Sequence, residues 1–435
     1  MSYRHDVRTL KNGLRVVTVA MPHLHSAQVG VYARVGSRHE TPETNGLSHF
    51  LEHMFFRGCD GFEDSTALNA AMEDLGGYLD GFTTRDYSGY QSVVHPRYVG
   101  EAADILGRMF KGPRFMDLEI ERSIILEEIL DALDERGKEI ELDVVAHQLA
   151  FEGHPLAQSI DGPRKNLKRF TVEDLEAHRK RFYGAKNLVL TFAGAIDPKA
   201  CHKAAESAFG DLFAGKVASE GKAPPLPKVA PRWRFVKSDD NQTRVRMSFR
   251  AVSDVHQDYP ALLLLRRVLD GGLSARLQVE MVERRGIAYE IGADLEVYSD
   301  CGLLDFELAV ANRKVGYALT ELGQVLASLR KEGVTQDELD RVRRRARISL
   351  EFGLDSPGEL AQWYGANRLF HEPSPPEERM ARLEQVTVAD LRAAARKYLD
   401  PRRMTVAAVG GADRPTVAGA KRAVKAVAEA LEGAR

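Results

Sequence analysis

The sequence predicts an α+β fold made of two tandem homologous domains, each a mixed, largely antiparallel sheet packed against helices. Three observations predict this fold class. The chain has 435 residues, more than one hydrophobic core ordinarily supports. Two segments half a chain apart repeat the same order of elements. Neighbouring strand patterns are separated by few residues with helices clustered between them, which is typical of α+β folds rather than alternating βαβ units.

The repeat lies at residues 171–197 and 387–413, which align without a gap over 27 positions with seven identities. In each copy a threonine precedes an amphipathic helix, and a strand then leads into a turn of small residues ending in aspartate. The offset of 216 residues favours a duplicated domain of ordinary size. The alternative is two unrelated copies of a common helix–turn–strand unit.

A change of composition marks the boundary between the two copies. Residues 214–232 are rich in Pro, Ala, Gly and Lys and show no apolar periodicity, a composition that stays extended and solvated. We therefore expect an N-terminal domain at 1–215, a linker at 216–232 and a C-terminal domain at 233–435.

In the first half, alternating apolar and β-branched residues predict strands, and apolar residues at helical spacing predict helices. The expected strands are 14–21, 28–36, 78–83 and 87–94, and the expected helices are 45–57, 65–76, 97–111 and 117–150. Thr44 or Asn45 can cap the start of the helix at 45–57, and Gly58 fits its end.

The second half repeats this pattern. Strands are expected near 233–250 and 287–311, and helices near 258–285 and from 313 to 371. The tail at 414–435 is a basic amphipathic helix, which we expect to be solvated rather than to anchor the chain to a membrane.

The composition excludes several classes of function. With 44% hydrophobic residues, 29% charged residues and a net charge of −2, the chain offers no electrostatic case for nucleic acid or an anionic membrane. No run approaches the roughly 20 apolar residues of a membrane helix, and the N-terminus lacks the apolar core of a signal peptide. The odd set Cys59, Cys201 and Cys301 contains no CxxC, which indicates reduced thiols and a cytoplasmic protein.

The segment 46–58, GLSHFLEHMFFRG, places two histidines and a glutamate inside an otherwise apolar run. Polar groups buried without partners are costly, so something must satisfy them. His49, Glu52 and His53 share one face of the predicted helix. Two imidazoles four residues apart can bind one Zn²⁺, with the glutamate as base; this His-x-x-Glu-His order is the inverzincin motif. The alternative is a chance pattern on a buried helix.

A catalytic zinc ion takes three protein ligands and leaves a position for water, so a third ligand must come from another element. Residues 117–134 offer several acids. Glu121 and Glu128 are seven residues apart, close to two helical turns, and therefore share a face. Glu128 stacks on the apolar side of this helix, whereas Glu127 is expected to face solvent. Surface salt bridges remain the alternative for each of these acids.

These segments resemble the pitrilysin-type (M16) zinc metallopeptidases. The resemblance covers nearly the whole chain and includes LKNGLRVV, SHFLEHMFFRG, GGYLDGFTTRDYSGY, ERSIILEEI and, in the second half, GGLSARLQVEMVERRGIAY. It implies a fold of the LuxS/MPP-like type and a small bacterial two-domain subunit similar to the beta subunit of the mitochondrial processing peptidase. It also implies one catalytic domain and one degenerate domain.

Position by position, the resemblance implies that His49, His53 and Glu128 bind zinc. Glu52 is then the general base, and Glu121 is an acid that supports the ligands from outside. The implied activity is hydrolysis of unfolded peptides held in an enclosed chamber, with the peptide paired to the edge strand at Asp80, Gly81 and Phe82. Relatives often carry Asn-Ala in place of Asp80-Gly81.

The second half departs from the family pattern at one position. Active relatives carry an arginine and a tyrosine seven residues apart that bind substrate and stabilise the oxyanion. Here Tyr289 is present, but Val282 stands in place of the arginine. On a helix, Arg284 and Arg285 would lie about 200° and 300° around from position 282, so neither simply replaces it.

This departure leaves several functions open. The chain is expected to act as a homodimer, or as a heterodimer with a related M16 subunit that supplies a complete Arg/Tyr pair. A second class of function is a non-catalytic core or scaffold subunit of the same fold. A third is a small-molecule metalloenzyme on an unrelated fold, against which the resemblance in the second half argues.

Overall fold

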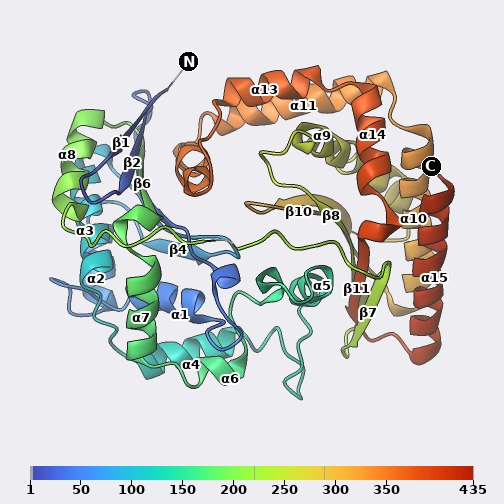
Figure 1. The fold of residues 1–435 in the computed structure, drawn as a ribbon, viewed down its shortest axis with the longest axis horizontal. Coiled ribbons are helices and arrows are strands. Elements are labelled where there is room, and N and C mark those ends of the chain that lie inside the picture. The colour runs from blue at the N-terminus through green and yellow to red at the C-terminus, as the bar shows by residue number, and fades with distance from the viewer. Residues whose placement is uncertain (1–2, 220, 289, 435) are drawn as a thin grey trace. The chain divides into compact units, whose positions relative to one another are not determined.

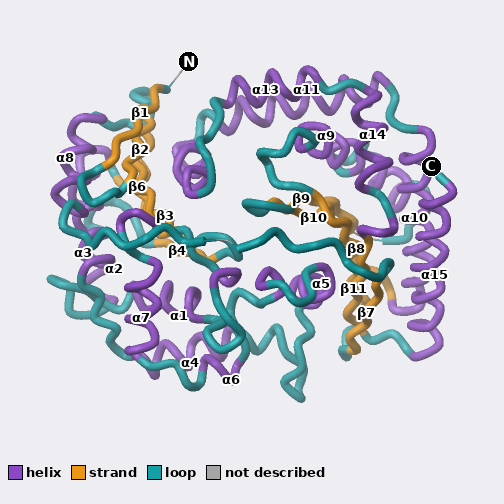
Figure 2. Tube along the Cα trace, in the orientation of Figure 1, coloured by secondary structure: helices purple, strands orange, loops and turns teal. Residues whose placement is uncertain are grey.

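The computed structural model describes residues 3–219, 221–288 and 290–434 (Figure 1). The chain forms two compact units, each assembled from three segments. Unit 1 comprises Met1–Ile129, Gln158–Gly221 and Glu351–Ser374, and unit 2 comprises Leu130–Ala157, Lys222–Leu350 and Pro375–Arg435. Each unit contains one mixed sheet packed against helices, which confirms the predicted α+β fold class; Figure 2 shows these strands in orange and the helices in purple.

The sheet of unit 1 has six strands in the order β1-β2-β6-β3-β5-β4. β2 and β6 are parallel and the other neighbours are antiparallel. The strands are β1 (Arg4–Thr9), β2 (Arg15–Ala20), β3 (Ala27–Ala33), β4 (Asp80–Thr83), β5 (Ser88–Val94) and β6 (Leu188–Gly194). β3 and β6 are buried along their whole length, as the apolar runs of central strands require.

The sheet of unit 2 has five strands in the order β7-β11-β8-β10-β9. β7 and β11 are parallel and the other neighbours are antiparallel. This sheet therefore repeats the five-strand arrangement β2-β6-β3-β5-β4 of unit 1. The strands are β7 (Arg232–Lys237), β8 (Gln242–Ala251), β9 (Glu290–Val297), β10 (Gly302–Ala311) and β11 (Met404–Gly410).

Helices cover the sheets. In unit 1 they are α1 (Leu47–Phe55), α2 (Ser65–Glu73), α3 (Val99–Lys111), α4 (Leu118–Glu128), α6 (Arg164–Leu167), α7 (Val172–Phe182), α8 (Pro198–Phe209) and α12 (Pro357–Ala361). In unit 2 they are α5 (Leu142–Ala150), α9 (Tyr259–Leu269), α10 (Val315–Glu332), α11 (Gln336–Gly353, which begins in this unit), α13 (Pro376–Gln385), α14 (Val388–Tyr398) and α15 (Arg414–Gly433). The pair α3/α8 packs on the first sheet and the pair α10/α15 on the second (Figure 1).

Each unit also includes one segment from the other half of the sequence, whereas the sequence suggests two continuous domains. In unit 1, α12 and the residues after it bring Leu360 and Tyr364 into a core with Val17 and Tyr32. In unit 2, α5 packs on the sheet and shares a core with β7 and β11. The segments supply apolar cover that the sheets would otherwise lack.

The repeated helix–strand pattern has the same local structure in both places. Thr171 and Thr387 each cap a helix by accepting the backbone N–H of the third helical residue, Asp174 or Asp390. Each aspartate in turn accepts from the backbone of its threonine, which completes a capping box. The strands β6 and β11 follow as predicted.

The predicted single helix at 117–150 is wrong. It is divided into α4 and α5, because the side chain of Asp134 accepts the backbone N–H groups of Arg136 and Lys138, and Gly137 adopts a left-handed conformation (φ +74°). Such a turn satisfies its own backbone groups and keeps the segment between α4 and α5 from being helical. β1 was not expected because its residues are mostly exposed at the sheet edge and show no clear alternation.

All three cysteines are buried and none forms a disulfide. Among the described residues, no helix combines the length and the apolar character that crossing a membrane would require.

Candidate metal centre

The helix α1 carries the predicted histidines and begins differently from the prediction. Gly46, not Asn45 or Thr44, is its capping residue, with φ +103° and no side chain to accept a hydrogen bond. The buried carboxylate of Glu40 instead accepts the backbone N–H groups of Gly46 (2.8 Å) and Ser48 (2.6 Å). Asn45 donates its amide to the same carboxylate at 2.9 Å. The predicted cap was wrong because a buried acid earlier in the chain takes over this role.

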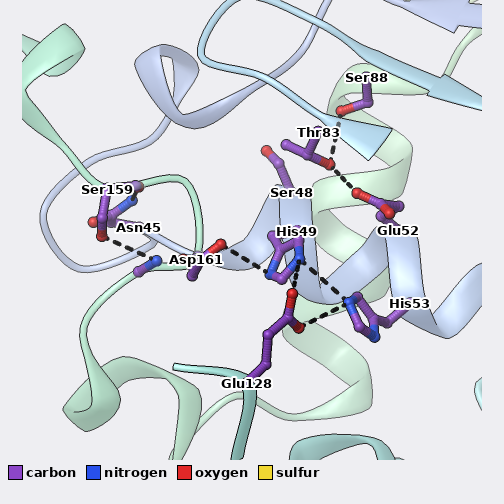
Figure 3. A network of polar contacts seen from close by, with 12 residues as sticks. Asn45, Ser48, His49, Glu52, His53, Thr83, Ser88, Glu128, Ser159 and Asp161 are labelled. Carbon is purple, nitrogen blue, oxygen red and sulfur yellow. Dashed lines mark hydrogen bonds and ion pairs between the residues drawn. The ribbon is translucent and has the colours of Figure 1, made fainter. Parts of the chain in front are cut away.

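Side chains of α1 and α4 converge on one point (Figure 3). The Nε2 atoms of His49 and His53 lie 3.2 Å apart. The carboxylate oxygens of Glu128, at the end of α4, lie 3.9 Å from His49 Nε2 and 3.5 Å from His53 Nε2. Two ligands of a tetrahedral zinc ion with bonds of 2.0–2.1 Å are about 3.3 Å apart. The three residues therefore fit one zinc ion.

The other ring nitrogen of each histidine faces an acid. Glu121 Oε1 lies 2.7 Å from His53 Nδ1, and Asp161 Oδ1 lies 3.6 Å from His49 Nδ1. Arg57 forms an ion pair with the second oxygen of Glu121. A carboxylate at Nδ1 favours the tautomer with its proton there, and leaves Nε2 with the lone pair that a metal needs.

The protonation states suit metal binding. Burial, reinforced by the neighbouring His53, lowers the pKa of His49 to about 3, so this ring is neutral at pH 7. Burial acts in the same direction on the pKa of His53, but the hydrogen bond to Glu121 and the nearby carboxylates outweigh it and raise the pKa. Burial raises the pKa of Glu121, yet its bond to His53 and the charge of Arg57 lower it overall. The acids around His53 thus favour its charged form, whereas burial keeps His49 neutral.

Glu52 lies on α1 between the two histidines and is itself buried. Thr83 donates its hydroxyl to Glu52 Oε2 at 2.5 Å, and Ser88 donates to Thr83 at 3.3 Å (Figure 3). Burial is the largest effect on its pKa and raises it to about 7, although the bond from Thr83 opposes the rise. A carboxyl group with a pKa near 7 can both accept and release a proton at neutral pH.

Glu128 is more exposed than its predicted place on an apolar helix face suggests. Its side chain is 51% accessible, because its neighbour Ile124 is itself exposed at 48% and only Ile125 is buried. Glu127 is exposed as well. Burial therefore does not separate the two acids. What separates them is that Glu128, at the last residue of α4, approaches the histidines.

The predicted peptide-binding residues form β4, at the edge of the six-stranded sheet. β4 pairs with β5 and lies last in the strand order. Gly81 passes directly over α1: a Cβ atom there would lie 2.7 Å from the Phe56 ring and 3.3 Å from Glu52 Cγ. Asp80 and Phe82 flank this contact. The strand backbone approaches α1 so closely here that a side chain at position 81 would require the Phe56 ring to shift.

The segment of unit 2 that departs from the family pattern is not a regular α-helix. Val282 lies in a π-helical turn, Gln278–Glu283, and packs partly buried against the core of the unit. Arg284 and Arg285 each form an ion pair with Glu280, at 2.5 Å. The angular positions of Arg284 and Arg285 expected from an α-helix therefore do not apply. Both side chains are nevertheless held by Glu280, so neither replaces an arginine at position 282. Tyr289 lies outside the described residues.

Several residues of the site gave no sequence signal. Glu40 is six residues before the cap, and Thr83 and Asp161 belong to other segments. A capping box links residues three positions apart and a helical period links residues of one helix, whereas Glu40, Thr83 and Asp161 reach α1 from outside it.

Comparison with known proteins identifies the family. The family model described as "Insulinase (Peptidase family M16)" matches residues 15–164, and the one described as "Peptidase M16 inactive domain" matches residues 169–346. A protease from Helicobacter pylori, known from a crystal structure, has the same fold, with a TM-score of 0.86 at 21% identity over 94% of this chain and 100% of the other.

Similarity in sequence extends over most of the length of several relatives. An uncharacterized zinc protease of Mycobacterium tuberculosis is 30% identical over 412 residues, which cover 92% of this chain and 92% of the relative. A probable mitochondrial-processing peptidase subunit beta of Arabidopsis thaliana is 30% identical over 93% of this chain and 78% of its own length. These relatives and the two consecutive family matches show that the chain belongs to peptidase family M16.

Proposed function

We propose that the protein is a zinc-dependent endopeptidase that hydrolyses unfolded peptides. One observation carries this proposal: the imidazole Nε2 atoms of His49 and His53 and the carboxylate of Glu128 converge on one point, beside a buried glutamate. Relatives named zinc proteases support the choice of metal and reaction. His49, His53 and Glu128 would hold the ion.

When bound, zinc supplies a Lewis acid that polarises the scissile carbonyl and acidifies the attacking water. Glu52 then takes the proton of that water and delivers it to the leaving amine. Thr83 fixes the carboxylate by its hydrogen bond to Oε2, which leaves Oε1 for the proton. Glu121 and Asp161 act through the histidines, whose rings they orient.

The edge strand β4 supports an extended peptide as the substrate. An added strand can hydrogen-bond to the open edge of a sheet and needs no folded partner. Because Gly81 lies against Glu52, a peptide paired with Asp80, Gly81 and Phe82 would run next to the proposed base. We therefore place the scissile bond at this edge.

Zinc content and peptide digestion of the purified chain test the proposal together. We expect one zinc ion per chain and cleavage of an unstructured peptide that a chelator abolishes and zinc restores. Glu128→Gln should lose zinc, and Glu127→Gln, its exposed neighbour on the same helix, is the matched control. A chain that binds no zinc, or equal zinc loss in both variants, would contradict the assignment.

A second candidate function is that of one subunit in a dimer, active only with a partner. The observation that favours it is the absence of a suitable arginine in the described part of 278–288, where Val282 packs on the core and Arg284 and Arg285 are held by Glu280. Losing one oxyanion-stabilising donor typically costs about 10²–10³ in rate. A related M16 subunit in a heterodimer, or a second copy in a weakly active homodimer, would fit.

Turnover measured alone and after adding a related subunit separates the two candidates. Rapid cleavage by the pure chain, unchanged by the partner, would exclude the dependent subunit. A gain of activity in Val282→Arg would show that the missing arginine limits the rate.

A further inference from the structure

Arginine side chains gather around a small surface pocket in unit 2. The pocket has a volume of about 40 Å³ and lies between α9, the loop that follows it and α11. Its polar lining consists of Arg267, Ser274, Arg276, Glu338, Arg341 and Arg345. One water needs roughly 10–15 Å³ of such space, so the pocket has room for a compact group of several atoms.

The acid in this lining already has its charge compensated. Arg276 donates two hydrogen bonds to Glu338, both at 2.7 Å, and Thr335 adds its backbone N–H at 2.9 Å and its hydroxyl at 3.1 Å. Burial on its own would raise the pKa of Glu338, but these donors lower it to about 2. Glu338 and Arg276 thus neutralise each other, and Glu338 does not compensate the charge of the other arginines that line the pocket.

Those arginines have no counter-charge within the described part of unit 2. No carboxylate lies within ion-pair distance of Arg267, Arg341 or Arg345 among the described residues. Arg267 Nε is buried and makes no hydrogen bond. Burial, and after it the charges of Arg266 and Arg345, lower the pKa of Arg267. The buried Nε of Arg267 is costly unless an acceptor satisfies it, and the exposed guanidinium groups of Arg341 and Arg345 beside it repel one another unless an anion lies between them.

The local geometry brings the guanidinium groups onto the same side of the pocket. Arg341 and Arg345 are four residues apart on α11 and share a helix face. Gly272, with φ +132°, lets Arg345 lie against the loop after α9: a Cβ atom there would be 2.4 Å from Arg345 Nη1. A side chain at position 272 would push this guanidinium out of the pocket.

We propose that the pocket binds a phosphate group, held by Arg267, Arg341 and Arg345. Guanidinium donors match the oxygens of phosphate and form strong charge-assisted hydrogen bonds. One guanidinium group can donate to both oxygens of a planar carboxylate, as Arg276 does to Glu338. Arg267 on α9 and Arg341 and Arg345 on α11 offer donors from two helices to one anion, which suits the several oxygens of a phosphate. The ligand is free phosphate or the phosphate of a small ester, and the site is independent of the metal centre.

Calorimetric titration of the full-length chain with inorganic phosphate, at an ionic strength held constant with chloride, tests this site. We expect saturable binding of one phosphate that weakens by about tenfold or more in Arg341→Gln/Arg345→Gln, because hydrogen bonds to charged groups are the strong ones. Both residues are exposed, so the fold should tolerate the change. Arg344→Gln removes an exposed arginine of the same helix that does not line the pocket and should keep the affinity within twofold.

Two further titrants are adenosine monophosphate, which identifies the source of the phosphate, and acetate, which tests the preference for phosphate over a carboxylate. Adenosine monophosphate binding more tightly than phosphate would indicate a phosphate ester, and equal affinity would indicate the free anion; either result supports the site. Three results would overturn it: no phosphate binding, the same affinity in the double variant as in the wild type, or acetate binding as tightly as phosphate. An equal loss in Arg344→Gln would also overturn it, since it would show a general effect of charge.

Discussion

The two units share an arrangement of five strands, to which unit 1 adds β1, but they place different residues on the helix that follows β3 in unit 1 and β8 in unit 2. In unit 1 this helix is α1, which carries His49, Glu52 and His53. In unit 2 it is α9, whose sequence YPALLLLRRVL buries leucines and contains no histidine or acid. α9 contributes Leu262, Leu265 and Leu269 to the largest core cluster of its unit. The fold therefore forms without a histidine or an acid at this place.

The difference shows that the polar cluster of α1 is not a requirement of the architecture. An apolar helix packs at the same position with less desolvation cost, so the buried acid and the histidines of α1 reduce stability unless a ligand compensates them. Residues that fold stability does not explain are expected at functional sites. The comparison thus supports the metal centre by an argument separate from the distances.

Unit 2 has a group of its own that resembles a metal site only in composition. Asp143, His147 and Glu296 lie close together, as His49, His53 and Glu128 do. The arrangement differs: His147 Nδ1 faces Asp143, with its backbone carbonyl at 2.8 Å and its carboxylate at 3.3 Å, whereas Nε2 faces Glu296 at 3.1 Å. The acids bracket the ring from opposite nitrogens. This group has a single imidazole with an acid at each ring nitrogen, whereas in unit 1 the Nε2 atoms of two histidines face one carboxylate.

The largest expected effect is that of His49→Ala, which should remove zinc and peptidase activity together while the chain stays folded. The fold should survive because unit 2 builds the corresponding helix without a histidine or an acid. Metal analysis, peptide cleavage and circular dichroism measure the three properties. An unfolded variant would show that α1 depends on its histidine, contrary to the comparison with α9.

Glu52→Gln should lower the rate of peptide cleavage by about 10²–10⁴, the usual contribution of a general base, and leave one zinc ion per chain. Glutamine keeps the acceptor for the Thr83 hydroxyl, so the local packing is preserved. Stopped assays with an unstructured peptide and parallel metal analysis check this outcome. Wild-type cleavage by the zinc-loaded variant would exclude Glu52 as the base.

Glu121→Gln and Asp161→Asn should each weaken zinc retention or activity by roughly 10–100-fold, the usual effect of residues that orient metal ligands. The effect of Glu121 should be the larger one, because it lies 2.7 Å from His53 whereas Asp161 lies 3.6 Å from His49. Competition with a chelator measures the zinc affinity. Glu119→Gln, an exposed acid on α4 that pairs with Arg122, is the control and should match the wild type.

These outcomes also show what the sequence could and could not predict. Spacing along one helix was sufficient to predict that His49, Glu52 and His53 lie close together, because all three lie within two turns of α1. It could not reveal Glu40 or Asp161, which reach α1 from loops whose path depends on the whole unit. The turn at Asp134 had a local signal, an acid and a glycine three residues apart, which the apolar pattern on either side of it obscured.

The smallest expected effect on zinc is that of His147→Ala. This variant tests whether the group Asp143, His147 and Glu296 differs from the metal centre of unit 1 in binding no zinc. His147 is fully buried and its ring bonds to the Tyr298 hydroxyl at 2.7 Å as well as to the acids. Its removal leaves these partners without a hydrogen bond, so the variant should be less stable by about 1–3 kcal/mol. Denaturant unfolding measures this loss. Zinc per chain should remain one, because the convergent group in unit 1 is untouched. A fall from two ions to one would instead mean that the bracketing acids rearrange around a second metal, and that the distinction between convergent and bracketing donors fails for this protein.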